Sequence, residues 1–205
     1  MKDLFKGWRT VPNFLTFSRI VLVPFIAVLF CKGELIWALV LLAVSGLTDL
    51  FDGKIARRFN QVSALGKILD PVADKLTQIT LAILLFITFN NVTNKTLKAF
   101  SWVFLVFILK EAVMVIGGAI MLAIGIRPGA AEIYGKVATF AYYVVMITVI
   151  CFGPEIGALR AVFTLPDAVM MALVVISAIL TLVAFASYMP GLRTQLKEHF
   201  ASKNK

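Results

Sequence analysis

Residues 35–58 (LIWALVLLAVSGLTDLFDGKIARR) and 64–90 (ALGKILDPVADKLTQITLAILLFITFN) decide the fold of this chain. Each stretch is long enough to cross the hydrocarbon core of a bilayer as a helix, which takes about 20 residues. The first stretch carries Asp49 and Asp52 near its end, and the second carries Asp70 and Asp74 near its start. Carboxylates are costly in or near a bilayer and are rarely placed there without a functional task. The two stretches therefore predict a helical membrane protein with an acidic site.

The rest of the 205-residue chain has the same character, because 60% of its residues are hydrophobic and only 15% are charged. Soluble domains usually contain about 25% charged residues. Further apolar segments bring the expected total to six spans: 12–31, 98–124, 131–152 and 166–188. Residues 1–10 mix basic and apolar side chains, which is typical of an interfacial helix. We therefore expect an all-α membrane bundle forming one domain over residues 1–205, with the six spans within 12–188 and a cytoplasmic tail at 189–205.

The net charge of +9 indicates contact with anionic lipid rather than nucleic acid, because the basic residues cluster at the ends of the apolar runs. An even number of spans places both termini on one side of the membrane. Thirteen Lys and Arg residues then fall on that side and four on the other, namely Lys32, Lys95, Lys98 and Arg160. The excess predicts that the termini and the acidic site face the cytoplasm in the cell membrane.

Helical periodicity gathers the acids into two stripes. Asp49, Asp52, Gly53 and Ala56 are spaced i, i+3, i+4 and i+7, which places them on one face of a helix. The small residues leave space beside the backbone, and the next residue, Arg57, has a planar fork that suits phosphate oxygens. This first stripe therefore offers oxygen ligands for a metal followed by a phosphate-binding cation.

The second stripe consists of Gly66, Asp70 and Asp74, again at intervals of four residues. Ser63 is placed to cap the start of its helix. Four converging carboxylates cannot all remain ionised at neutral pH without cations between them, and oxygen ligands favour hard divalent ions. The alternative is an interhelical salt-bridge network with the neighbouring basic residues, which would explain single pairs but not the whole set.

The string Asp49-x2-Asp52-Gly53-x2-Ala56-Arg57-x8-Gly66-x3-Asp70-x3-Asp74 resembles the signature of the CDP-alcohol phosphotransferases, and every position of that signature is present. The resemblance extends along the chain, from the interfacial helix through the six spans. It implies a transferase that uses two divalent ions, Mg²⁺ or Mn²⁺, takes a CDP-linked donor such as CDP-diacylglycerol and releases CMP. It also implies a homodimer.

Carried onto this chain, the resemblance assigns a role to each motif residue. The four aspartates would bind the two ions, and Asp74 would also be the general base that deprotonates the acceptor hydroxyl. Arg57 would hold the diphosphate of the donor. The remaining contacts to the CDP-linked donor would come from Asp49, Asp52, Gly53, Ala56 and Gly66.

The acceptor is indicated by weaker motifs. Val11-Pro12-Asn13-x-Leu15-Thr16-x2-Arg19 is similar to the phosphatidylglycerophosphate synthases and to the related CDP-type cardiolipin synthases. The former bind the acceptor phosphate with an Arg-Glu pair and a Gly-Lys-x-Lys-Thr string, where this chain has Lys110-Glu111 and Gly135-Lys136-Val137-Ala138-Thr139. Lys110, Lys136 and Thr139 are thus candidate phosphate contacts, although Lys110 could instead pair with Glu111. Glycerol 3-phosphate is the first choice of acceptor, and phosphatidylglycerol, which would give cardiolipin, is the alternative.

Two interpretations from other classes compete with the transferase. An ion-coupled membrane transporter would also place acids in a bundle, but it would spread them across the depth of the membrane. A structural scaffold would leave the acids unexplained. Arg19, inside the first span, needs a partner in either case, and the aspartates, the acceptor phosphate and a structural bridge are its candidates.

Overall fold

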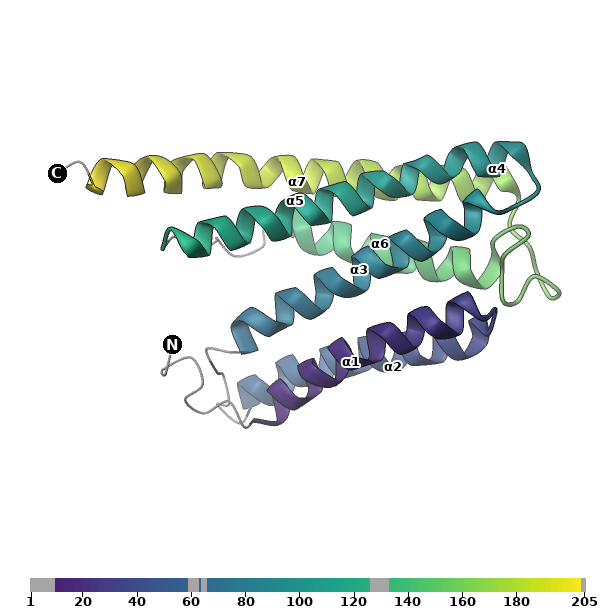
Figure 1. Cartoon of the computed structure of the whole chain (residues 1–205), viewed down its shortest axis with the longest axis horizontal. Coiled ribbons are helices and arrows are strands. Elements are labelled where there is room, and N and C mark those ends of the chain that lie inside the picture. Colours follow the sequence, from purple (N-terminus) through teal and green to yellow (C-terminus); the bar gives the residue numbers. More distant parts are fainter. Residues whose placement is uncertain (1–9, 59–62, 64–65, 126–132, 204–205) are drawn as a thin grey trace. The chain divides into compact units, whose positions relative to one another are not determined.

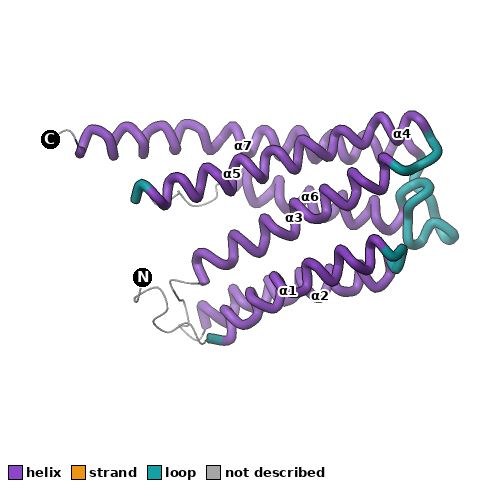
Figure 2. The backbone as a smooth tube through the Cα atoms, in the orientation of Figure 1, coloured by secondary structure: helices purple, strands orange, loops and turns teal. Residues whose placement is uncertain are grey.

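The computed structural model of the chain describes residues 10–58, 63, 66–125 and 133–203. Within these ranges, the description leaves out the side chains of 49–58, 67–68, 122, 198, 200 and 202–203. The described residues form helices joined by turns and loops, with no strand among them (Figure 2). The expected all-α architecture is confirmed, whereas the expected interfacial helix at 1–10 falls almost wholly outside the described residues.

The helical elements, in chain order, are α1 (Val11–Cys31), α2 (Leu35–Arg58), α3 (Gly66–Asn90), α4 (Lys95–Phe100), the 3-10 turn η2 (Ser101–Val103), α5 (Phe104–Ala123), α6 (Ile133–Phe152) and α7 (Asp167–Lys203). Among the described residues, five stretches are long and apolar enough to cross a membrane: Val11–Cys31, Leu69–Asn90, Lys95–Met121, Ile133–Phe152 and Asp167–Lys197. The sixth expected span, α2, has a shorter apolar part, Leu35–Thr48, ahead of its aspartates. The fold is therefore that of a multi-pass membrane protein.

Large apolar side chains on the outside of the helices support this assignment. On α1, Phe14 is 72% exposed, and Phe17 and Phe25 are also exposed. On α6, Phe140 is exposed to the same extent, 72%. Water would disfavour such surfaces, whereas lipid acyl chains solvate them, so these helix faces are suited to contact with the bilayer.

Two helices differ from their expected boundaries. The fourth span begins at Lys95, because Asn94 caps it by accepting hydrogen bonds from the backbone N–H groups of Thr96 and Leu97. The last span does not end at residue 188, and α7 continues through Pro190 to Lys203. The expected tail is thus largely helical, because hydropathy marks the end of apolar character and not the end of backbone hydrogen bonding.

The chain divides into two compact units, residues 1–84 and 85–205, which are described separately. In the first unit, α1 and α2 lie side by side and run in opposite directions (Figure 1). The turn between them uses Gly33 at φ +78°, a left-handed conformation that favours glycine. Its N–H donates to Phe30 O at 3.0 Å, and the Lys32 N–H donates to Val28 O at 3.0 Å. This tight turn fixes α2 against α1, and α3 contributes its residues up to Leu84 to the same unit.

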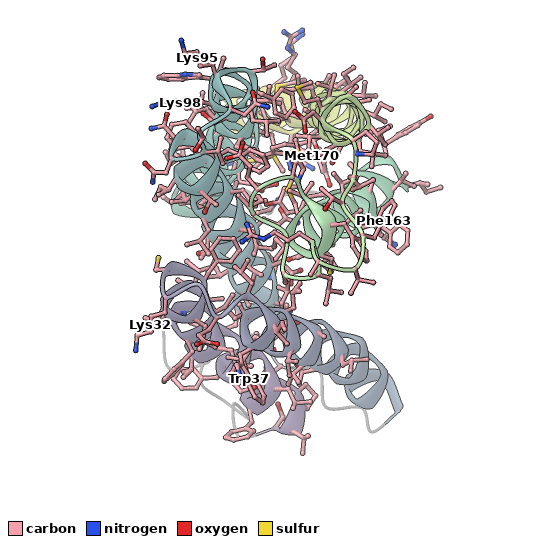
Figure 3. The ribbon with its side chains drawn as sticks, turned by 90° about the vertical axis from the view of Figure 1, so that its right-hand side faces the viewer. Lys32, Trp37, Lys95, Lys98, Phe163 and Met170 are labelled. Carbon is pink, nitrogen blue, oxygen red and sulfur yellow. The ribbon has the colours of Figure 1, made fainter. Side chains whose placement is uncertain are left out.

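In the second unit, α6 packs against α7, and the core combines aliphatic side chains with aromatic rings and methionines. The rings of Phe89 and Phe104 stack with their centroids 5.4 Å apart. Met170 of α7 is fully buried and points in among the helices, whereas Lys95 and Lys98 project outward from α4 (Figure 3). The unit thus has an apolar interior and a basic outer surface at α4.

The loop at residues 153–166, between α6 and α7, is fixed by polar contacts to the turn that follows α3. Glu155 adopts φ +63°, which is uncommon for a residue with a side chain. Its carboxylate accepts hydrogen bonds from the backbone N–H groups of Thr93, at 2.9 Å, and Asn94, at 3.2 Å. The Asn94 side-chain amide in turn donates to the Asp167 carboxylate at 2.9 Å. The turn is therefore tied to the loop through Glu155 and to the start of α7 through Asp167.

Candidate active site

Asp70 and Asp74 lie one turn apart near the start of α3, on the common face that their spacing predicts. Their side chains are 47% and 43% exposed, respectively. Both carboxylates belong to the first unit, so their surroundings can be described together with α1. Two partly exposed carboxylates on one helix face form an acidic surface that can accept hydrogen bonds or bind a cation.

Helix α1 has a buried stripe whose polar half meets these carboxylates. The stripe recurs every three or four residues, as helical periodicity requires, and consists of Pro12, Asn13, Thr16, Arg19, Val23, Ile26 and Phe30. Its first half is polar and its second half is apolar. Since burying a polar or charged group without a partner is unfavourable, the polar half must find partners inside the unit.

Arg19 finds those partners in both aspartates. Its Nη1 donates to Asp74 Oδ1 at 2.7 Å, and its Nη2 lies 3.6 Å from Asp70 Oδ1. The Arg19 side chain is only 4% exposed. Removing a cation from water costs several kcal/mol, and two adjacent carboxylates offset that cost. Of the partners considered for Arg19 from the sequence, the structure shows the acidic cluster, through Asp70 and Asp74.

Thr16 adds a hydrogen bond one turn earlier. Its hydroxyl donates to Asp70 Oδ1 at 2.5 Å, within the range of O–H···O⁻ bonds to an ionised carboxylate. The carbonyl of Pro12 lies 3.1 Å from the same hydroxyl. A hydroxyl has one proton to donate, and the charged acceptor at the shorter distance is the stronger partner. Thr16 and Arg19 therefore converge on one oxygen of Asp70.

The start of α3 is tied to α1 through Ser63 and Asn13. Ser63 Oγ accepts a hydrogen bond from the Gly66 N–H at 2.8 Å, which confirms the expected cap, and its hydroxyl donates to Asn13 Oδ1 at 2.8 Å. A Cβ on Gly66 would lie only 2.5 Å from Asn13 Oδ1. The space that this glycine opens is therefore occupied by α1. Its contact with a nucleotide, expected from the sequence, stays a prediction.

The other half of the motif lies in α2, whose backbone is helical through Arg58 as expected. Asp49, Asp52, Gly53, Ala56 and Arg57 thus share the predicted helix, but their side chains lie outside the described part of the chain. Among the side chains that are described, no three His, Cys, Asp or Glu residues converge. The four-carboxylate site therefore remains a prediction.

The available donors fit a hard divalent ion in type. Asp70 and Asp74 offer carboxylate oxygens at a partly exposed position, and these are the ligands that Mg²⁺ and Mn²⁺ favour. A carboxylate has about four acceptor positions, so a contact to α1 at Oδ1 is compatible with a further bond. The described half of the motif can thus contribute two of the ligands expected from the sequence.

The expected acceptor contacts lie in the second unit. Lys110 is engaged by its neighbour, because its Nζ lies 2.5 Å from Glu111 Oε1 and both side chains are largely buried, at 10% and 6% exposed. The ion pair foreseen as an alternative is therefore present. Lys136 is exposed and Thr139 is half-buried. They stand three residues apart on α6, which places them on neighbouring positions of one helix face.

Comparison with known families gives a match to CDP-alcohol phosphatidyltransferase over residues 9–183, which is most of the chain. The matched region contains the whole motif from Asp49 to Asp74, together with α1. The chain belongs to the CDP-alcohol phosphatidyltransferase family. Membership agrees with the resemblance inferred from the motif and with the all-helical membrane fold.

Individual members of the CDP-alcohol phosphatidyltransferase family with similar sequences carry two kinds of name. A Streptomyces coelicolor protein named cardiolipin synthase (CMP-forming) is 36% identical over 137 residues, which is 64% of this chain and 60% of that protein. A Rickettsia typhi protein named CDP-diacylglycerol--glycerol-3-phosphate 3-phosphatidyltransferase is 41% identical over 71 residues, 33% of this chain and 40% of that protein. A human cardiolipin synthase (CMP-forming) is 47% identical over 75 residues, 36% of this chain and 25% of that protein. The matched segments thus span only part of each relative.

Two residues beside the phosphatidyltransferase motif, Asn13 and Thr16, receive no individual role from the sequence, which places them only in a string that indicates a subfamily. For Ser63 the sequence predicts the helix cap but not the bond to Asn13. The signal available for Asn13 and Thr16 was their place in the buried stripe of α1, where a polar residue needs a partner. Their contacts to Gly66 and Asp70 could be assigned only once α1 and α3 were placed together.

Proposed function

We propose that this protein transfers a phosphatidyl group from CDP-diacylglycerol to a glycerol-type hydroxyl and releases CMP. The proposal depends on the pair of partly exposed carboxylates, Asp70 and Asp74, which Arg19 of α1 contacts. Both belong to a family motif of which every position is present in this chain. The names of the similar proteins, which include cardiolipin synthases that form CMP and a CDP-diacylglycerol-dependent transferase, support it.

The reaction is a displacement at phosphorus. The acceptor oxygen forms a bond to the phosphorus that carries the diacylglycerol, and the bond from that phosphorus to the oxygen of CMP breaks. Asp74 takes the proton of the acceptor hydroxyl, because a partly exposed carboxylate within reach of the acceptor can serve as general base. Arg57 holds the diphosphate through paired N–H donors and so orients the donor.

The four motif aspartates are proposed to hold two divalent ions, Mg²⁺ or Mn²⁺. When bound, such ions neutralise the charge of the diphosphate and of the departing CMP. Gly53, Ala56 and Gly66 are proposed to line the nucleotide side of the same site. All of these residues belong to the first unit, within residues 1–84.

Phosphatidylglycerol is the acceptor that we favour, with cardiolipin as product. The Streptomyces coelicolor cardiolipin synthase (CMP-forming) matches 64% of this chain, and a Mycobacterium bovis protein named putative cardiolipin synthase matches 69%. In addition, the Lys110 ammonium is engaged by Glu111, which reduces the positive charge available for a phosphomonoester dianion. A phosphodiester carries one negative charge less and needs fewer cations. This order reverses the first choice made from sequence alone.

Glycerol 3-phosphate stays as the second candidate, because specific observations favour it as well. The Rickettsia typhi relative named for that acceptor is 41% identical over 71 residues. Lys136 is exposed on α6, with Thr139 nearby on the same face, so both could contact an acceptor phosphate. With the family known, we do not pursue the ion-coupled transporter.

We further propose that the site and both termini face the cytoplasm in the cell membrane, and that the protein works as a homodimer. The thirteen-to-four distribution of basic residues supports the orientation. A donor with two acyl chains can then stay in the lipid while its nucleotide reaches a site at the membrane surface.

An acceptor panel tests the proposal. Purified full-length protein in lipid vesicles would receive CDP-diacylglycerol and Mg²⁺, with labelled phosphatidylglycerol, glycerol 3-phosphate, serine or inositol supplied separately. We expect CMP and labelled cardiolipin only with phosphatidylglycerol. Product with glycerol 3-phosphate instead would select the second candidate, and no CMP with any acceptor would contradict the transferase. Chelation of the metal should stop turnover and lower the thermal unfolding midpoint, because ions that bind only the folded protein stabilise it.

A further inference from the structure

We infer that Thr16 and Arg19 of α1 are positioning residues, which hold the α3 carboxylates of the proposed active site in a fixed orientation before any ligand binds. The inference rests on the proposed function for the role of Asp70 and Asp74, and on the described geometry for everything else. Neither Thr16 nor Arg19 belongs to the family motif that spans Asp49 to Asp74.

The first argument is that the contacts are selective for one oxygen. Thr16 and Arg19 both approach Asp70 at Oδ1, and Arg19 reaches Asp74 at Oδ1 as well. A carboxylate that is held by one oxygen has lost its freedom to rotate, so the direction of its second oxygen is set. The α1 contacts therefore define how both carboxylates are presented.

The second argument is the contrast in burial across these contacts. Thr16 is fully buried and the Arg19 side chain is 4% exposed, whereas the two carboxylates keep more than two-fifths of their surface open. A bond that only joined two helices would have no reason to leave the acids so accessible. Here the rigid partners lie inside the unit and the carboxylates lie at its accessible edge.

The third argument is electrostatic. Carboxylates at positions i and i+4 repel each other and tend to turn apart. The Arg19 guanidinium stays charged at every physiological pH, contacts both carboxylates and cancels one of their two charges. Its planar fork can serve two acceptors at once, which a lysine ammonium on a flexible stem does less well. Arg19 thus keeps Asp70 and Asp74 close enough together to act on one ligand.

The same charge opposes a divalent cation at these carboxylates. A cation already bound to Asp70 and Asp74 competes with an incoming ion for the same negative charge, so Arg19 should weaken metal binding even while it improves the geometry. Replacing Arg19 should therefore strengthen metal binding. Replacing a residue that contributed only to packing would loosen the fold and weaken metal binding. The sign of the change in metal affinity therefore separates positioning from packing.

Three measurements on the full-length protein test the inference: the dissociation constant for Mn²⁺, kcat with the acceptor found in the panel, and the thermal unfolding midpoint. For Thr16→Val, which keeps the shape and loses the donor, we expect kcat to fall about tenfold, since hydrogen bonds to charged groups are stronger than those between neutral groups. Thr16→Ser keeps the hydroxyl and should stay within about twofold of the starting protein. Ser18→Ala is the matched control, because that α1 hydroxyl bonds only to Leu15 O of its own helix in the described contacts.

Variants of Arg19 test its charge and its planar shape separately. Arg19→Met should bind Mn²⁺ about tenfold more tightly, because the competing charge is gone, while kcat falls by about a hundredfold or more. Arg19→Lys keeps the charge and should bind Mn²⁺ within about threefold of the starting protein, with kcat reduced by the loss of the fork.

Two outcomes would overturn the inference: equal kcat for Thr16→Val and Thr16→Ser, or weaker Mn²⁺ binding in Arg19→Met together with a lowered unfolding midpoint. Failure of the proposed function would look different, because the starting protein itself would then form no CMP. The Mn²⁺ measurement does not depend on turnover, so even then it distinguishes an electrostatic effect of Arg19 on Asp70 and Asp74 from a packing effect.

Discussion

Asp74 is the residue on which the proposed chemistry depends most. Asp74→Asn keeps the size of the side chain and removes both the base and the charge, so we expect kcat to fall by about 10²–10⁴-fold, the usual contribution of a general base. The variant should still fold, because Arg19 retains Asp70 as an anionic partner at 3.6 Å. Turnover and the thermal unfolding midpoint would be measured together. Near-normal turnover in a folded variant would remove Asp74 as the base.

For individual residues, the sequence predicted the acids and the need of Arg19 for an anionic partner, but not the roles of Asn13 and Thr16. The acids are visible because charge inside an apolar run is rare, and the same is true of Arg19. A threonine or an asparagine in an apolar helix is common and gives no comparable signal. For Lys110 the charge is evident from the sequence, but its partner is not. The sequence allowed either a contact to the acceptor phosphate or a pair with Glu111, and the structure shows the pair.

The packing of α1 against the start of α3 depends on the absence of a side chain at Gly66. In Gly66→Ala, the new Cβ would lie 2.5 Å from Asn13 Oδ1, so Asn13 would have to move and its bond with Ser63 would weaken. We expect a loss of about 1–3 kcal/mol in the free energy of unfolding, measured by denaturation in detergent. Gly46→Ala on α2 is the control, because its Cβ would meet nothing within 4 Å and alanine favours a helix.

A double-mutant cycle checks the cause of that loss. If Asn13 is the obstacle, Gly66→Ala should cost less in the background of Asn13→Ala than in the starting protein. Equal costs in both backgrounds would show that the side chain of Asn13 does not set the distance between α1 and α3.

Element positions could be predicted well where apolar runs coincide with helices and less well elsewhere. The second segment, expected at 35–58, is α2 at Leu35–Arg58. The start of α4 and the end of α7 differ from expectation, because a capping side chain sets the first and a charged but helical sequence extends the second. Neither feature is encoded in hydropathy.

For the whole molecule, the distribution of basic residues predicts that both termini face the cytoplasm. In a background with Cys31 and Cys151 replaced by alanine, Glu34→Cys would mark the turn between α1 and α2, and Ala201→Cys would mark the end of α7. Both positions are exposed. We expect a membrane-impermeant maleimide to label the first in intact cells and the second only after permeabilisation. The opposite pattern would reverse the orientation and place the acidic site outside.

Family membership could be predicted from the sequence because the motif is long and its spacing is fixed. The acceptor could not, because the residues proposed to contact it, Lys110, Lys136 and Thr139, are separated in sequence from the motif and depart from the pattern of the phosphatidylglycerophosphate synthases. These residues lie in the second unit, whereas the motif common to the family lies in the first.

The double tie between the loop at 153–166 and the turn after α3 has a practical consequence for protein engineering. Glu155 and Asn94 bridge segments about sixty residues apart in the chain, so an epitope or a fluorescent reporter spliced into this loop would separate the carboxylate from the amides that it serves. Affinity handles for purification are better attached after Lys203, where α7 ends.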